Sequence, residues 1–252
     1  RLPSRPRDSR SNHHTMSSTH IAPSQRKTAS WYSLTLKKYG FLMFLLPVSL
    51  PLQAWWGAQL FGHWDAWAFL VPIVFFVQIP LLDALIGQDP ANAAPADEAA
   101  LNADRYYQVL PLLCLPLYVA ALVFGAWVMA IAPFSALGYL GWVLSIGCVG
   151  GVIAINTGHE LIHKTTKLET TAGGLLLACV GYGSFKVEHI YGHHVHVSTP
   201  GDGSSAPLGD NVYAFIARAF IRNGGMGYRL EQANAERRGV TCRAGGIDGQ
   251  GG

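Results

Sequence analysis

Residues 106–158 read YYQVLPLLCLPLYVAALVFGAWVMAIAPFSALGYLGWVLSIGCVGGVIAINTG, and none of these 53 residues carries a charge. One helix of that length would measure about 80 Å, whereas the hydrocarbon core of a bilayer is about 30 Å thick. The chain must therefore turn back, and Ala132-Pro133 is the place where a helix would end. We expect two spanning helices here, from Tyr106 to Ile131 and from Phe134 to Asn156.

A second uncharged hairpin precedes this one. Between Tyr39 and Leu82 the only Asp, Glu, Lys or Arg is Asp65, which divides the stretch into a span from Tyr39 to about Gly62 and another from Ala66 to about Leu82. Only 13% of the residues are charged, against about a quarter in soluble domains. The sequence thus predicts an all-α integral membrane protein, a helical bundle with about four transmembrane helices.

The distribution of basic residues predicts the orientation of the bundle in the membrane. Beside the first span lie eight basic residues against one acid, Asp8: Arg1, Arg5, Arg7, Arg10, Arg26, Lys27, Lys37 and Lys38. Such a cluster marks the cytoplasmic side. Four spans return the chain to this side after Asn156, and Lys164, Lys167 and Lys186 agree with that orientation. The net charge of +3 is too small to indicate nucleic-acid binding.

The segments outside the spans are predicted from composition. We expect residues 1–30 to be a disordered tail or upstream translation, and Gln88 to Asp104 to be a cytoplasmic loop. Thr171 to Phe185 is apolar but short, and is predicted as a packed or re-entrant helix. Residues 223–252 are predicted as an atypical tail, arising from truncation or a shifted reading frame. The four cysteines form no close pair, so no disulfide is expected.

Two histidine clusters follow the last span. His159 and His163 are spaced i, i+4 in HELIHK, so on a helix both imidazoles share one face. His189 and His193 repeat that spacing in EHIYGHH, while His194 is rotated by about 100° on an α-helix and would reach a neighbouring metal ion. Five histidines in two such motifs predict a transition-metal site, because imidazole suits these ions.

The other histidines are weaker candidates for metal ligands. His13 and His14 lie in the predicted tail and His63 in a turn, so all three are interpreted as non-functional. His196 shares a helical face with His189 and His193, and whether it is a spare ligand or a supporting group stays open.

The two motifs resemble those of the alkane 1-monooxygenase family, the membrane-bound, histidine-rich diiron hydroxylases that include xylene monooxygenase. The resemblance rests on HELxHK at His159 to Lys164 and on EHxxGHH at Glu188 to His194. It continues through VSTP at Val197 to Pro200 and the run from Asp202 to Gly209, and upstream it includes DALIGQD at Asp83 to Asp89. It covers about Trp31 to Arg222, which defines a predicted membrane hydroxylase domain over residues 31–222.

This resemblance implies hydroxylation of the terminal carbon of a medium- or long-chain n-alkane with O2. Two iron ions would form the metal centre, and rubredoxin with rubredoxin reductase would supply electrons in the bacterial inner membrane. Carried over to this sequence, the iron ligands are His159, His163, His189, His193 and His194. The resemblance further implies three carboxylates that orient imidazole N–H groups, namely Glu160, Glu188 and Asp83.

The sequence departs from the family in one respect. Family members carry two more spans, a third cluster of the form HxxHH and a further histidine motif, none of which is present by Gly252. We therefore expect an incomplete domain, and no turnover of octane or hexadecane by this chain alone.

Three other functions remain open from the sequence. His159, Glu160 and His163 also fit HExxH, the pattern of zinc metalloproteases, in which the glutamate acts as general base. A fatty-acid desaturase or hydroxylase shares the use of histidine clusters, although its usual second cluster has HxxHH spacing. A fragment that inserts in the membrane without binding metal is the fourth reading.

Overall fold

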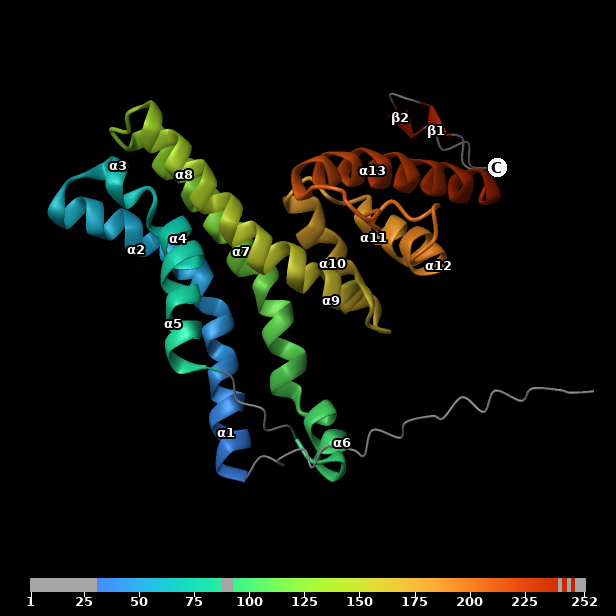
Figure 1. Ribbon diagram of the computed structural model, residues 1–252, viewed down its shortest axis with the longest axis horizontal. Helices are drawn as coiled ribbons and strands as arrows, with labels where there is room; N and C mark the ends of the chain where they lie inside the picture. Colours follow the sequence, from blue (N-terminus) through green and yellow to red (C-terminus); the bar gives the residue numbers. More distant parts are fainter. Residues whose placement is uncertain (1–30, 88–92, 240–241, 244–245, 248–252) are drawn as a thin grey trace, which may run out of the picture.

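The computed structural model describes residues 31–87, 93–239, 242–243 and 246–247, and this part of the chain is almost entirely helical (Figure 1). The expectations for residues 1–30, including His13 and His14, lie outside it. The first half contains α1 (Trp31–Gly40), η1 (Phe41–Leu45), α2 (Leu46–Phe61), α3 (Trp64–Trp67), α4 (Leu70–Ile73), η2 (Val74–Gln78), α5 (Ile79–Ile86), α6 (Pro95–Ala103) and α7 (Arg105–Ile131).

The second half carries the histidine motifs. It contains α8 (Ala136–Val149), η3 (Gly150–Ile155), α9 (Asn156–Ile162), α10 (Lys167–Cys179), α11 (Phe185–Glu188), η4 (His189–His193), α12 (His194–His196), α13 (Val212–Arg237) and a hairpin of β1 (Cys242–Arg243) and β2 (Gly246–Ile247). Of the η segments, η1 is a 3-10 helix, and η2, η3 and η4 are π-helices.

Three helices in the described residues are long and apolar enough to cross a membrane. They are Leu34–Phe61, Arg105–Ile131 and Ala136–Ile162, which match three of the four predicted spans. The helices beside these three also expose large apolar side chains. In α5, for example, Leu85 is 73% exposed. Such exposure suits contact with lipid and agrees with the predicted membrane protein.

The predicted second span begins four residues later than expected, because the helix is interrupted at Ala68 and Phe69. The continuous apolar helix runs only from Leu70 to Ile86. Pro72 has no backbone N–H and so leaves the carbonyl of Ala68, four residues earlier, without its helical donor. The buried hydroxyl of Ser145 on α8 donates to that carbonyl instead, at 2.6 Å. A side chain of a neighbouring helix thereby compensates for the break.

The segment predicted as a loop from Gln88 to Asp104 contains a helix, α6. Pro95 stands in its first turn, together with Asp97 and Glu98. Proline is favoured at a helix start and acids stabilise the positive end of the helix dipole, which explains why this polar stretch is helical. Residues 88–92 lie outside the described part of the chain.

Two buried clusters hold the long helices together. One joins α7, η3, α9 and α10 through Tyr118, Ile153, Leu161 and Leu176, among others. The second surrounds Trp142 of α8, whose indole N–H donates to the carbonyl of Gly125 on α7 at 2.9 Å. These clusters fix the helix that ends in the first histidine motif.

The last long helix, α13, lies against α11 (Figure 1). Its first turn is capped by the side chain of Asn211, which accepts from the N–H of Ala214 at 2.9 Å. The helix continues without a break from Val212 to Arg237, so the domain boundary predicted between residues 222 and 223 falls inside it. Asn223 is one of its buried residues.

Candidate metal centre

The first histidine pair is placed by α9, the continuation of α8 and η3. His159 lies in the last turns of α9 and His163 caps its end. Their Nε2 atoms are 3.2 Å apart, as the i, i+4 spacing predicted. Beneath them α9 packs closely on α10, where a Cβ atom added to Gly173 would lie 2.8 Å from the carbonyl oxygen of Gly158.

The second motif forms a π-helix and not the α-helix that was expected. The N–H of His194 donates to the carbonyl of His189, five residues earlier, as in a π-helix. The side chains of these two residues therefore lie near the same side of the helix axis. The Nε2 atoms of His189 and His194 are consequently 3.0 Å apart. This places His194 with the first pair, which the α-helical period did not predict.

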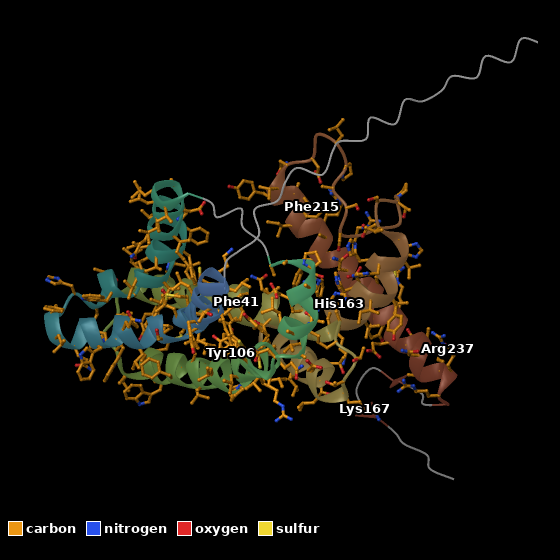
Figure 2. All side chains as sticks on the ribbon, turned by 90° about the horizontal axis from the view of Figure 1, so that it is seen from below. Phe41, Tyr106, His163, Lys167, Phe215 and Arg237 are labelled. Carbon is orange, nitrogen blue, oxygen red and sulfur yellow. The ribbon has the colours of Figure 1, made fainter. Side chains whose placement is uncertain are left out.

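Four imidazoles converge at this point. The Nε2 atom of His189 lies 2.8 Å from that of His159 and 3.1 Å from that of His163. Phe185 stacks on the His189 ring, with ring centroids 4.7 Å apart. In Figure 2, His163 lies between the long apolar helices and α13, which carries Phe215 and Arg237. We call His159, His163, His189 and His194 the histidine cluster.

His193 belongs to the same motif but faces another partner. Its Nδ1 atom is 2.9 Å from Oδ1 of Asp202, whose side chain is fully buried. Burial alone would raise the pKa of Asp202, but hydrogen bonds from His193, the Ser205 hydroxyl and the N–H of Ser204 outweigh it and lower the pKa to about 2. Asp202 lies in the run that resembles the family, but it was not predicted as a site residue.

The three predicted carboxylates lie in different surroundings. Glu188 is 2% exposed and its Oε2 atom has no hydrogen-bond partner. Burial, followed by the neighbouring charge of Asp202, raises the pKa of Glu188 against the opposing effect of His193. Glu160 is exposed and pairs with Lys164 at 3.8 Å. Asp83 is exposed on α5, which lies on the far side of the molecule from α12 in both views (Figure 1).

A cavity of about 270 Å³ lies between the second histidine motif and α13. Glu188, Gly192, Asn223 and Met226 are among the residues that line it. Asn223 donates to the Ser204 hydroxyl at 2.8 Å, while its Oδ1 atom has no partner. Two of the residues that line the cavity, Glu188 and Asn223, thus each have a buried oxygen atom without a partner.

The remaining described histidines lie outside the cluster. His63 is exposed in the turn after α2 and has a left-handed backbone, with φ of 56°. His196 is exposed at the end of α12, and only its carbonyl is engaged, by the Thr199 hydroxyl at 2.6 Å.

The protonation of the cluster favours metal binding. Burial, followed by the charges of neighbouring histidines, lowers the pKa of His189 to about 4. The same two causes lower the pKa of His163. A neutral imidazole is the form that binds a metal ion, because the ion takes the lone pair that a proton would otherwise occupy.

The spacing and chemistry of the cluster fit a transition-metal ion. Two nitrogen atoms bound at right angles to one ion, each at about 2.1 Å, lie about 3 Å apart. The Nε2 separations of 2.8 to 3.2 Å agree with that value. Neutral imidazoles with several Nε2 lone pairs aimed at one point repel one another, whereas a cation there would bind them all. His159, His163 and His189 meet this condition most closely.

Comparison with known proteins finds relatives among the alkane 1-monooxygenases. Residues 134–244 match the family model of the fatty acid desaturases. The chain is 46% identical over 217 residues to alkane 1-monooxygenase 2 of Pseudomonas aeruginosa, covering 85% of this chain and 57% of that protein. It is 39% identical over 209 residues to alkane 1-monooxygenase of Ectopseudomonas oleovorans, covering 81% and 51%.

A more distant relative is the xylene/toluene monooxygenase hydroxylase component of Pseudomonas putida, at 26% identity over 76% of this chain and 51% of that protein. The resemblance to the alkane 1-monooxygenases that the motifs predicted is confirmed over most of the chain. The chain spans about half the length of the curated relatives it matches.

Proposed function

From this relationship to the alkane 1-monooxygenases, we propose that the chain contributes to a membrane monooxygenase that hydroxylates the terminal carbon of n-alkanes. The observation that carries the proposal is the convergence of His159, His163, His189 and His194 at the end of an apolar helix. An alkane reaches its enzyme through lipid, so a metal site at the end of a spanning helix suits this substrate.

We assign two iron ions to the complete centre. The histidine cluster would hold one of them, and His193 would present its free nitrogen to the second. Iron ions, when bound, supply the activation of O2 that an unreactive C–H bond requires. Within this chain the five histidines would provide nitrogen donors, and α9, η4 and α12 position them at the end of the apolar helices. Glu188 stays a candidate for a supporting carboxylate, because it is buried beside them.

Electrons would come from rubredoxin and its reductase, and the cluster would lie on the cytoplasmic side of the bacterial inner membrane. A cavity shared by the end of α1 and the turn after α9 supports this orientation. Lys37 and Phe41 line the same cavity, of about 960 Å³, as Lys164 and Thr166. By the positive-inside rule, the face that carries Lys37, Lys38 and Lys164 would be cytoplasmic, and His163, next to Lys164, would lie near it.

Metal binding by the purified protein tests the centre directly. We expect Fe(II) or Co(II) to bind, and His163→Ala to weaken the affinity by more than the ~10–100-fold that loss of an outer partner of a ligand costs. His63→Ala is the matched control, because His63 is exposed outside the cluster. Equal affinities of the two variants, or no binding by the wild type, would contradict the proposed centre.

A chimaera tests the reaction. Residues 31–237 would replace the equivalent part of the Pseudomonas aeruginosa relative, and the product would be supplied with rubredoxin, its reductase, O2 and octane or hexadecane. We expect a terminal alcohol, and its loss in a chimaera with His189→Ala. A folded, metal-loaded chimaera that gives no alcohol from any n-alkane would overturn the proposed substrate.

The zinc protease reading is less well supported. It requires Glu160 as a general base beside the metal, but this side chain is 71% exposed and paired with Lys164. It also leaves His189 and His194 without a role. A desaturase would use the same histidines, and the chimaera distinguishes it, since desaturation gives no alcohol.

A further inference from the structure

We propose that Asp202 is the positioning residue of His193, holding its imidazole so that only Nε2 is free to bind a metal ion. The inference rests on the proposed metal centre and adds to it a residue outside both histidine motifs. It concerns the histidine that is hydrogen-bonded to a carboxylate, in contrast to the four whose Nε2 atoms converge.

The contact between the two side chains is well defined. Oδ1 of Asp202 lies 2.9 Å from Nδ1 of His193, and the Asp202 side chain is fully buried whereas that of His193 is 22% exposed. An ionised carboxylate only accepts hydrogen bonds, so Nδ1 must carry the proton. The lone pair of this imidazole is then on Nε2. A carboxylate that accepts from the far nitrogen of a metal-binding histidine fixes its tautomer and its orientation.

The loop that carries Asp202 is built around its carboxylate. The Ser205 hydroxyl donates to Oδ2 at 2.6 Å, and the N–H of Ser204 donates to Oδ1 at 2.9 Å. The N–H of Ser198 approaches Oδ2 at 3.4 Å, from a residue with a left-handed φ of 62°. The carboxylate therefore keeps its place independently of His193, as a positioning group must.

Helix α13 fixes the same loop from the other side. Asn223 donates to the Ser204 hydroxyl at 2.8 Å. The loop approaches this helix so closely that a Cβ atom on Gly203 would lie 2.1 Å from Oδ1 of Asn223. His193 is thus connected through Asp202 and Ser204 to α13, which gives that helix a role in the geometry of the proposed centre.

The first test compares metal affinities of the purified full chain. Asp202→Asn keeps the size of the side chain but turns one acceptor into an N–H₂ donor, which conflicts with one of its present donors. We expect Co(II) to bind about 10–100-fold more weakly and its visible spectrum to change, as for other outer partners of metal-binding histidines. The control is Asp210→Asn, because Asp210 is in the same loop but pairs with Arg218; its affinity should stay within twofold.

A double-mutant comparison separates positioning from folding. In a His193→Ala background, Asp202→Asn should leave Co(II) affinity unchanged, because the imidazole that it orients is absent. An equal loss in both backgrounds would show a general structural role and overturn the inference. Ser205→Ala keeps the carboxylate but removes one of its hydrogen bonds, so it should lower the Co(II) affinity by less than Asp202→Asn does. This variant keeps the inference testable if Asp202→Asn fails to fold.

The outcomes distinguish the two proposals. If the wild type binds Co(II) and Asp202→Asn binds it equally well, the positioning role is wrong while the metal centre stands. If the wild type binds no Co(II), the metal centre fails and the positioning role fails with it.

Discussion

At His189, the Nε2 atoms of three other histidines lie within 3.1 Å of one nitrogen. The ring is also buried and stacked on Phe185. Protonation of two of these imidazoles would put positive charges against one another around the buried ring of His189. A metal ion at the cluster would therefore compete with protons, and the charge state of the cluster would affect the stability of the metal-free protein.

We predict that the metal-free protein becomes less stable as the pH falls from 6.5 towards 4. The pKa of His189 is about 4 in the folded protein against an ordinary value of 6.5, so the unfolded chain binds more protons in this window. The loss from this group amounts to at most about 1.4 kcal/mol per pH unit. Thermal unfolding in detergent at pH 7 and pH 5 measures it.

The comparison variant for this prediction is His189→Asn, which removes the titrating group. Its melting temperature should fall less between the two pH values than that of the wild type. Parallel pH dependences in the two proteins would show that His189 does not cause the effect.

Much of the histidine cluster could be predicted from the sequence at this scale. The i, i+4 spacing of His159 and His163 indicated one shared face, and the shared membrane face of the two motifs indicated that they meet. The roles of His193 and His194 could not be predicted from an α-helical period, because the segment is a π-helix. Asp202 was missed as a site residue because its contact with His193 depends on how the intervening loop folds.

At the scale of the helix, the cluster depends on a close approach of α9 and α10. Gly158 and Gly173 face each other with no room for a side chain on either. Leu161 and Leu176 fill the interface beside them and are fully buried. Because His159 and His163 project from the same α9 turns, any separation of the two helices would move both imidazoles relative to His189.

We predict that Gly173→Ala destabilises the protein by about 1–3 kcal/mol, the usual cost of overpacking, and weakens Co(II) binding. The new Cβ would lie 2.8 Å from the Gly158 carbonyl oxygen and 2.9 Å from the N–H nitrogen of Ile162. Denaturant unfolding and Co(II) titration measure the two effects.

The neighbouring Gly174→Ala is the matched control. Its Cβ would meet only the side chain of Lys186, at 3.2 Å, and that chain is flexible. The control should bind Co(II) like the wild type, and alanine should favour the helix. If Gly173→Ala behaved like Gly174→Ala, the close packing would not control the cluster.

At the scale of the whole molecule, two turns lie together at the end opposite the histidines. Asp65, just after α2, accepts from the N–H of Ser135 at 2.9 Å, in the turn between α7 and α8. The continuous helix from Ala136 to Ile162 then extends about 40 Å to the first histidine motif. The bundle therefore has one end with Asp65 and another with the cluster.

We predict that these two ends lie on opposite sides of the membrane. In a cysteine-free background, His63→Cys should react with a membrane-impermeant maleimide in intact cells, since it lies beside Asp65 and is exposed. Thr165→Cys, in the exposed turn after α9, should react only after the membrane is opened. Labelling of both from one side would contradict this arrangement.

The helical membrane fold was predictable because long uncharged stretches have few alternatives in a bilayer. Three of the predicted spans overlap most of the three long apolar helices of the structure. The number of four was not confirmed. Hydropathy does not register the break before Leu70, where Pro72 leaves the Ala68 carbonyl to the Ser145 hydroxyl.

The π-helical turn at His189–His193 also limits which insertions and deletions this segment can accept in evolution. A π turn contains one residue more than an α turn, so the loss of a single codon there would restore the α-helical register. His194 would then follow His189 by four residues and stay on its face, but His193 would follow it by only three, which would turn its imidazole relative to Asp202 although no histidine had been replaced. Substitutions at Ile190 or Tyr191 leave the register intact. The arrangement of imidazoles is therefore inherited through the number of codons in this turn as much as through their identity.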